Sequence, residues 1–139
     1  MTLLYFFHDL NHSDVQRRVE MLRQGGAAVT VIGFHRMATV PVVEGATLVG
    51  LGITEDGNFP QRILAVLRTL LTLHRWRDTF ADSDAVVARN LEMLVLAAMA
   101  RWRFLPGRPL TYECVDIHRL PGRRGGLCRS AGHRLCRPL

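Results

Sequence analysis

Two side chains that could move a proton, Asp116 and His118, follow the short apolar segment 110–115. Histidine titrates near neutral pH, and a neighbouring carboxylate can fix which ring nitrogen carries the proton. The pair could therefore orient a hydroxyl group and accept its proton, as a general base does. In the alternative, structural role, Asp116 caps a following helix and His118 packs at the start of that helix. The residue types alone leave both hypotheses open.

Arg89 and Asn90 follow another apolar segment, 84–88, in the same way. A guanidinium group binds phosphates and carboxylates through paired hydrogen bonds. Arg89 could therefore hold an anionic ligand, or it could pair with Glu113 or Asp116 of the protein itself. We take Arg89 and Asn90 as candidate substrate-binding residues.

A third polar segment, with His8, Asp9 and Asn11, follows the apolar run 3–7. His8 and His12 would form a metal-ligand pair if they lay four residues apart on one helix. A loop between a strand and a helix does not impose that geometry, so we expect no metal site here. We expect instead that the loop borders a cleft and contacts substrate.

The elements that position these residues alternate along the chain, with each apolar run followed by polar residues. In an α/β sheet the carboxyl ends of parallel strands lie at one edge, where ligands bind. The pattern predicts an α/β, Rossmann-like doubly wound parallel sheet. The expected strands are 3–7, 28–32, 47–51, 84–88 and 110–115, and the expected helices begin near residues 13, 60 and 91.

Capping signals mark two of the helices. Ser13 and Gln16 have the spacing of a capping box, and Asn90 can cap the helix that follows it. The helix expected from Pro60 to Arg77 has too many apolar residues for one stripe. Such a helix is either deeply buried or meets a partner surface.

The charge is unevenly distributed. All 18 basic residues are arginine, and the net charge is +6, of which +5 falls in residues 120–139. The body of the chain is nearly neutral, and the arginine-rich segment lacks interleaved aromatic residues, so we expect no nucleic-acid partner. Residues 121–139 have no helical or strand period, and we predict no regular structure there. A reading-frame error or a genuine basic tail would each explain this segment.

The cysteines indicate a reducing compartment. Three cysteines without regular spacing do not suit a disulfide framework, and there is no signal-peptide pattern, so we expect a cytoplasmic protein. Cys114 lies in an expected strand and is predicted to be a buried thiol. Cys128, His133 and Cys136 do not have the spacing of a zinc site.

The order of these segments resembles one family. The first strand with HDL, the helix DVQRRVEMLRQGG, the strand VTVIGF, and ADSDAVVARNLEMLVLAAMARW followed by PLTYECVDIHRL resemble the N-terminal domain of GT-B-fold glycosyltransferases. The similar group is the subfamily-4-like domain of bacterial exopolysaccharide enzymes. The resemblance covers about residues 3–120.

The resemblance implies a retaining transferase that moves a sugar from a nucleotide-sugar co-substrate to a lipid-linked or oligosaccharide acceptor. It implies no obligatory metal and no tightly bound cofactor. It places His118 near the reacting centre with Asp116 beside it, and it places acceptor contacts at the strand ends. The family usually has glycines after the first strand that face the donor diphosphate, where this chain has His8 to Asn11. Peripheral contact with the inner face of the membrane is a further expectation.

The resemblance also predicts the domain organisation. Residues 1–120 would form the acceptor-side domain, and 121–139 would be the basic tail. The family's C-terminal donor domain has no counterpart in 139 residues. We therefore expect the chain to be inactive without a second, donor-binding part. The alternative is a non-catalytic α/β module that binds a partner through the helix from Gln61 to Arg77.

Overall fold

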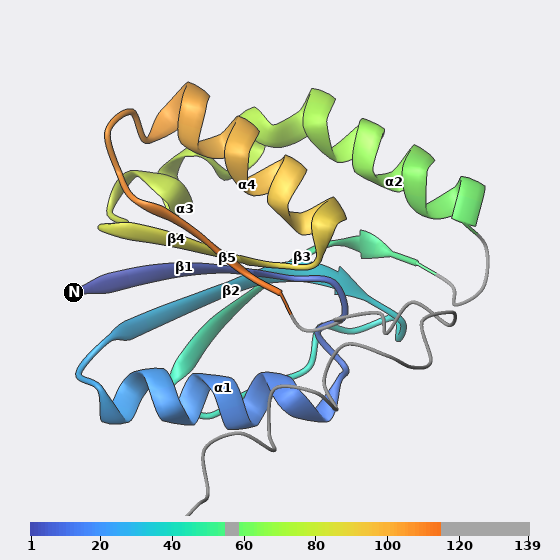
Figure 1. The fold of residues 1–139 in the computed structure, drawn as a ribbon. Coiled ribbons are helices and arrows are strands. Elements are labelled where there is room, and N and C mark those ends of the chain that lie inside the picture. The colour runs from blue at the N-terminus through green and yellow to red at the C-terminus, as the bar shows by residue number, and fades with distance from the viewer. Residues whose placement is uncertain (55–58, 115–139) are drawn as a thin grey trace, which may run out of the picture.

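The computed structural model describes residues 1–54 and 59–114, which form one parallel sheet with helices on both faces (Figure 1). The predicted α/β, Rossmann-like fold is confirmed. The strands are β1 (Thr2–Phe7), β2 (Ala28–His35), β3 (Ala46–Ile53), β4 (Ala85–Arg89) and β5 (Leu110–Glu113). The helices are α1 (Ser13–Gln24), α2 (Phe59–Thr72), the short 3-10 turn η1 (Leu73–Trp76), α3 (Arg77–Ala81) and α4 (Leu91–Phe104).

The strand order is β3-β2-β1-β4-β5, and every neighbouring pair is parallel. β2 and β3 follow β1 on one side of it, and β4 and β5 lie on its other side. The carboxyl ends of β1 and β4 therefore flank the point where the strand order reverses. In open α/β sheets, ligands bind in the crevice at such a point.

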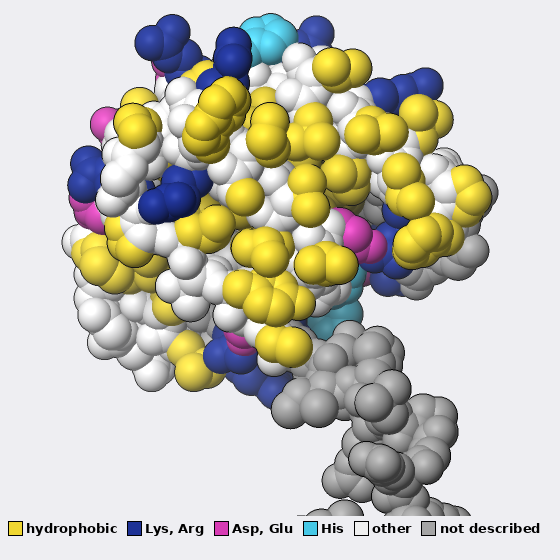
Figure 2. Space-filling view, turned by 45° about the horizontal axis from the view of Figure 1, so that its top comes forward, with side chains coloured by type: hydrophobic (Ala, Val, Ile, Leu, Met, Phe, Trp, Pro, Cys, Tyr) yellow, Lys and Arg dark blue, Asp and Glu magenta, His cyan; other side chains and the backbone are white. Residues whose placement is uncertain are grey.

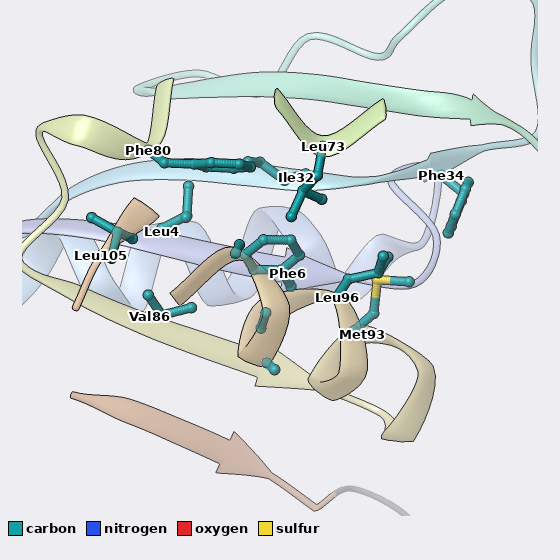
Figure 3. Packing of buried hydrophobic residues seen from close by; sticks show 13 residues of the cluster. Leu4, Phe6, Ile32, Phe34, Leu73, Phe80, Val86, Met93, Leu96 and Leu105 are labelled. Carbon is teal, nitrogen blue, oxygen red and sulfur yellow. The ribbon is translucent and has the colours of Figure 1, made fainter. Parts of the chain in front are cut away.

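Alternation along the strands divides the core between the two faces. Leu4, Phe6 and Ile32 point toward α4 and the segment after α2, and they pack with Leu73 and Phe80 (Figure 3). On the other face, strand residues including Tyr5, Phe7 and Val31 pack with Val15 and Val19 of α1. The strand β1 is thus covered on both sides, which explains why its sequence is continuously apolar.

A close approach between β1 and β2 fixes the start of the loop that follows β1. A side chain at Gly33 would place its Cβ only 2.0 Å from the carbonyl oxygen of Phe7. One residue on, Leu10 N–H donates to the Phe34 carbonyl at 2.8 Å. Only glycine allows the strands to run this close before the loop turns away.

Three local predictions need correction. The α1 cap is His12, whose Nδ1 accepts from the Asp14 N–H at 3.2 Å, and the predicted capping box from Ser13 does not form. Asn90 precedes α4 as predicted, but its side chain makes no capping hydrogen bond. The predicted strand to residue 115 ends at Glu113, so Cys114 is exposed and is not a buried strand thiol.

The predicted helix from Pro60 to Arg77 is also shorter, because α2 ends at Thr72. The Thr69 and Thr72 hydroxyls donate to carbonyls four residues earlier, at 2.8 and 3.0 Å. Such back-bonding bends helices. The change of direction lets Leu73 and Phe80 turn into the core, where they are 3% and 0% exposed.

Within residues 1–54 and 59–114, no helix has the length and apolar character that crossing a bilayer requires. Asp116, His118 and the segment 121–139 lie outside the described residues, so the predictions made for them stay predictions.

Candidate functional site

The candidate site lies where β1 and β4 end, around the ring of Phe7. The guanidinium carbon of Arg89 lies 4.8 Å from the centroid of this ring. The imidazole of His8 also stacks with Phe7, with ring centroids 5.2 Å apart and ring planes 16° apart. Two of the predicted substrate-binding residues, from strands that are neighbours in the sheet, are therefore brought together.

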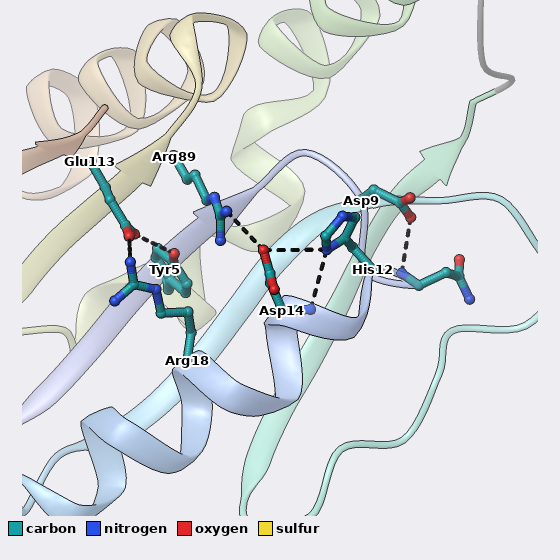
Figure 4. A network of polar contacts seen from close by, with 8 residues as sticks. Tyr5, Asp9, His12, Asp14, Arg18, Arg89 and Glu113 are labelled. Atoms are coloured by element: carbon teal, nitrogen blue, oxygen red, sulfur yellow. Dashed lines mark hydrogen bonds and ion pairs between the residues drawn. The ribbon is translucent and has the colours of Figure 1, made fainter. Parts of the chain in front are cut away.

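Arg89 is held in place by Asp14 of α1 (Figure 4). Its Nη2 donates to the Asp14 carboxylate at 3.0 Å, and only 8% of its side chain is exposed. The hydrogen bond from Arg89, together with its positive charge, lowers the pKa of Asp14. The predicted pairing of Arg89 with Glu113 is wrong, because Glu113 pairs with Arg18. The predicted pairing with Asp116 stays a prediction, since Asp116 lies outside the described residues. Asp14 was not predicted as a partner of Arg89, although an acidic residue in the first turn of the helix that follows a strand is a recognisable signal.

The pairing with Asp14 involves only one of the two terminal nitrogens of Arg89. Its Nη1 is buried and makes no hydrogen bond within the described residues. A buried donor without a partner costs free energy, and such groups are rare in folded proteins. Because this nitrogen has no exposed surface, a ligand oxygen could reach it only if the neighbouring side chains moved aside.

His8 has a similar unused atom. Its Nδ1 is buried without a hydrogen-bond partner in the described part of the chain. Burial lowers the pKa of His8 below its usual value, so the imidazole is neutral at neutral pH. The side chain faces a cavity of about 10 Å³, the size of one water molecule, which the ion pair between Arg62 and Glu92 also lines. The other lining residues are Phe34, Thr54, Val66 and Met93.

Asn90 connects this site to α4 with a strained backbone. Its φ and ψ angles are 73° and 155°, a combination that residues other than glycine rarely adopt. Strain of this kind costs on the order of 1–3 kcal/mol and concentrates at functional positions. The observation points to a role for the turn after β4 that does not depend on the Asn90 side chain as a helix cap.

Asp9 and Asn11 lie in the same loop as His8 but face β2. The Asp9 carboxylate accepts from the Asn11 N–H at 2.9 Å and pairs with Arg36 at 2.7 Å. The Asn11 side chain accepts from the Arg36 N–H at 2.8 Å. These contacts hold the loop against the end of β2. The structure thus brings His8 and Arg89 together, while Asp9 and Asn11 take structural contacts beside them.

A second polar cluster lies beneath the site and was not anticipated. Tyr5 donates to Glu113 at 2.6 Å, and Arg18 of α1 also binds this carboxylate (Figure 4). Burial and the neighbouring carboxylate raise the pKa of Tyr5. Tyr5 lies inside the continuously apolar run of β1, and this sequence context gives no sign of the partner of its hydroxyl group.

The site offers hydrogen-bonding groups to a ligand. His8 and His12 have ring centroids 6.0 Å apart. Among residues 1–54 and 59–114, no three His, Cys, Asp or Glu side chains come together as a metal-binding group. Arg89 offers an unused donor, and the neutral His8 can donate or accept a hydrogen bond.

The fold and this strand-end site define a Rossmann-like α/β domain. Its fold is similar to two crystal structures of the C-terminal domain of a hydrogenase from Pyrococcus furiosus, with TM-scores of 0.55 and 0.54. In both, the sequence identity is 11%, and the similarity covers 81% of this chain and 90% of the hydrogenase domain. This likeness concerns the fold alone.

In sequence, the chain is similar to the succinoglycan biosynthesis protein ExoL of Rhizobium meliloti, with 41% identity over 139 residues. The alignment covers 97% of this chain and 34% of ExoL, so the chain spans about a third of the length of that protein. The chain matches no model of a protein family.

Proposed function

We propose that the chain serves in exopolysaccharide biosynthesis, as the acceptor-side domain of a nucleotide-sugar-dependent glycosyltransferase of GT-B type. The observation that carries the proposal is the 41% identity to a succinoglycan biosynthesis protein along 97% of the chain. The Rossmann-like fold supports it, because sugar-nucleotide transferases of the family that the sequence resembles are built from such domains. The donor-binding half would be supplied by a further domain or chain.

The proposed reaction is the transfer of a sugar to a hydroxyl group. The acceptor oxygen forms a bond to the anomeric carbon of the donor sugar, and the bond from that carbon to the nucleoside diphosphate breaks. The diphosphate leaves with the bonding electron pair. The hydroxyl proton passes to a base, for which we propose His118, with Asp116 orienting its imidazole.

His8 and Arg89 support the acceptor side of this proposal. The neutral imidazole of His8 and the unused Nη1 of Arg89 lie at the sheet edge where the strand order reverses. Both can form hydrogen bonds with hydroxyl groups, which are the groups that a saccharide presents. We assign them to acceptor binding and give Asn90 the role of shaping the turn between them.

A chimera of ExoL tests the proposal. The stretch of ExoL that aligns with this chain is replaced by residues 1–139, and the chimera is expressed in Rhizobium meliloti lacking ExoL. We expect succinoglycan production to return, and to be lost again when His8→Ala or Arg89→Met is introduced. A chimera that is present at normal levels but leaves the strain without succinoglycan would overturn the proposal.

A second candidate function is a non-catalytic module that binds a partner. The observation that favours it is the outer face of α2, where Leu67 and Leu71 are 51% and 80% exposed. A chimera that restores succinoglycan equally well with both site variants would favour this function over the transferase.

A further inference from the structure

A small cavity lies between the end of β1 and the starts of α2 and α4. His8 lines it from the strand end, and Arg62 and Glu92 line it from the two helices. Its volume of about 10 Å³ is the size of one water molecule, and the Nδ1 atom of His8 has no exposed surface. A ligand therefore reaches this nitrogen only after a wall of the cavity has moved aside.

The wall on the side of the helices is an ion pair. The Nη2 of Arg62 donates to the carboxylate of Glu92, and the two side chains are 34% and 30% exposed. Each side chain thus has one part in contact with solvent and another part that lines the cavity. Figure 2 shows acidic, basic and histidine side chains close together at one margin of the mostly apolar helical layer. At this margin the ion pair separates the cavity from solvent.

The position of Arg62 does not favour its own helix. It lies near the start of α2, where the helix dipole disfavours a positive charge, and no acidic residue is present in the first turn to offset it. Glu92, in contrast, suits the first turn of α4. The charge of Arg62 is therefore balanced by the other helix, and the pair connects the starts of the two helices across the cavity.

The ion pair can separate without unfolding its surroundings. Ion pairs with this much exposure contribute little to stability, because water screens them and ordering two long side chains costs entropy. The apolar residues that line the cavity, Phe34, Val66 and Met93, pack in the hydrophobic core independently of the two charges. Opening the cavity therefore requires only that the side chains of Arg62 and Glu92 change their orientation.

We propose that Arg62 and Glu92 form a latch that closes the candidate site over His8 and separates when a ligand enters. Once separated, the guanidinium group and the carboxylate can both form hydrogen bonds with ligand hydroxyl groups beside His8. The nature of the ligand rests on the proposed function. The closure does not, because the latch is a property of the folded chain alone.

Met93 is a natural reporter of the latch. It lines the same cavity and is 1% exposed, whereas Met37, in the loop after β2, is 65% exposed. Hydrogen peroxide oxidises the methionine thioether to the sulfoxide, at a rate that follows the exposure of the sulfur. Mass spectrometry of peptides from the full chain measures both rates in one sample. In the wild-type protein we expect Met93 to be oxidised much more slowly than Met37.

Charge reversals open and restore the latch. Arg62→Glu and Glu92→Arg each place two like charges together, so we expect the oxidation of Met93 to become several-fold faster while that of Met37 stays the same. The double variant Arg62→Glu/Glu92→Arg restores an ion pair of opposite direction and should return Met93 to its wild-type rate. This variant keeps the unfavourable arginine in the first turn of α4, so it distinguishes the latch from a loss of helix stability.

A second ion pair supplies the matched control. Arg18 of α1 pairs with Glu113 on the other face of the sheet, and the two side chains are 38% and 22% exposed, much like those of the latch. Arg18→Glu breaks this pair at a distance from the cavity. We expect it to leave the oxidation rate of Met93 unchanged, and circular dichroism checks that each variant is folded.

Three results would overturn the inference. The first is a wild-type protein in which Met93 is oxidised as fast as Met37. The second is a folded single reversal of Arg62 or Glu92 that leaves the rate of Met93 unchanged, or a double reversal that does not restore it. The third is an equal acceleration in Arg18→Glu, which would mean that any broken ion pair loosens the core.

The latch and the proposed function can fail separately. The oxidation of Met93 requires no sugar transfer, so a negative result there overturns the latch and leaves the transferase proposal standing. An ExoL chimera without activity would overturn the transferase proposal, whereas a Met93 that responds to the charge reversals would still support the latch.

Discussion

Arg89, the last residue of β4, donates a hydrogen bond of 3.0 Å to Asp14, in the first turn of α1, across 75 residues of sequence. The bond joins α1 to the end of β4, beside the point where the strand order reverses. It also turns the guanidinium over Phe7 and leaves one of its nitrogens, Nη1, without a hydrogen-bond partner among the described residues. The shape of the candidate site depends on this one pair.

Arg89→Met tests the pair directly. The change removes the buried cation that lowers the pKa of Asp14, so that pKa should return toward its ordinary value. We expect the free energy of unfolding to fall by about 2 kcal/mol, because a buried hydrogen-bonded group is lost. Urea unfolding measures the stability, and carboxyl NMR measures the titration of Asp14. An unshifted Asp14 titration in the folded variant would contradict the contact.

His8 gives the protein a pH dependence of known sign. Burial lowers the pKa of His8 in the folded state below its unfolded value of 6.5. The unfolded chain therefore binds a proton more readily, and the contribution of His8 to stability is full above pH 6.5 and is lost as the pH falls below that value. We expect the free energy of unfolding to decline from pH 7 toward pH 5, and the decline to be smaller in His8→Gln. An equal slope in wild type and variant would count against the buried, neutral imidazole.

Asn90→Gly tests the strain at the turn after β4. Glycine adopts a φ of 73° with a ψ of 155° without the clash that a Cβ introduces. Because the Asn90 side chain makes no capping hydrogen bond, little is lost with it. We expect the variant to be more stable by about 1 kcal/mol in urea unfolding. A clear loss of stability would mean that the asparagine side chain has a structural contact of its own.

Gly33→Ala tests the close approach that sets the loop after β1. The new Cβ would lie 2.0 Å from the Phe7 carbonyl oxygen, so the strands must separate. We expect a loss of at least about 2 kcal/mol, and a changed His8 environment by NMR. Gly26→Ala is the matched control: its φ is +84° but no atom lies within 4 Å of the new Cβ, so only about 1 kcal/mol should be lost. Equal losses at both positions would contradict the account.

The sequence predicted the sheet well because its signals are local. The apolar run before His8 and the run before Arg89 each end at polar residues, and parallel strands place such ends at one edge. This pattern was enough to predict that His8 and Arg89 lie at one site. The confirmation of the fold rests on this regular alternation of strands and connections.

The partners of these residues could not be predicted, because they come from distant parts of the chain. The contact of Arg89 with Asp14 and that of Tyr5 with Glu113 span 75 and 108 residues. Nothing in the local pattern indicated that Asp9 and Asn11 would both bind Arg36. The early end of α2 could not be predicted either, because it depends on the packing of Leu73 and Phe80 in the core. This packing involves distant parts of the chain and leaves no local signal.

Sugar transfer by membranes of Rhizobium meliloti that carry the ExoL chimera tests the central claim most directly. Membranes from the strain without ExoL and from the strain with the chimera are supplied with a set of radiolabelled nucleotide sugars, and label in the lipid-linked fraction is counted. We predict that the chimera restores incorporation, that Arg89→Met and His118→Ala abolish it, and that Val42→Ala, at a position 96% exposed, leaves it unchanged. Restored incorporation that survives both site substitutions would contradict the assignment of this chain to the acceptor side of a glycosyltransferase.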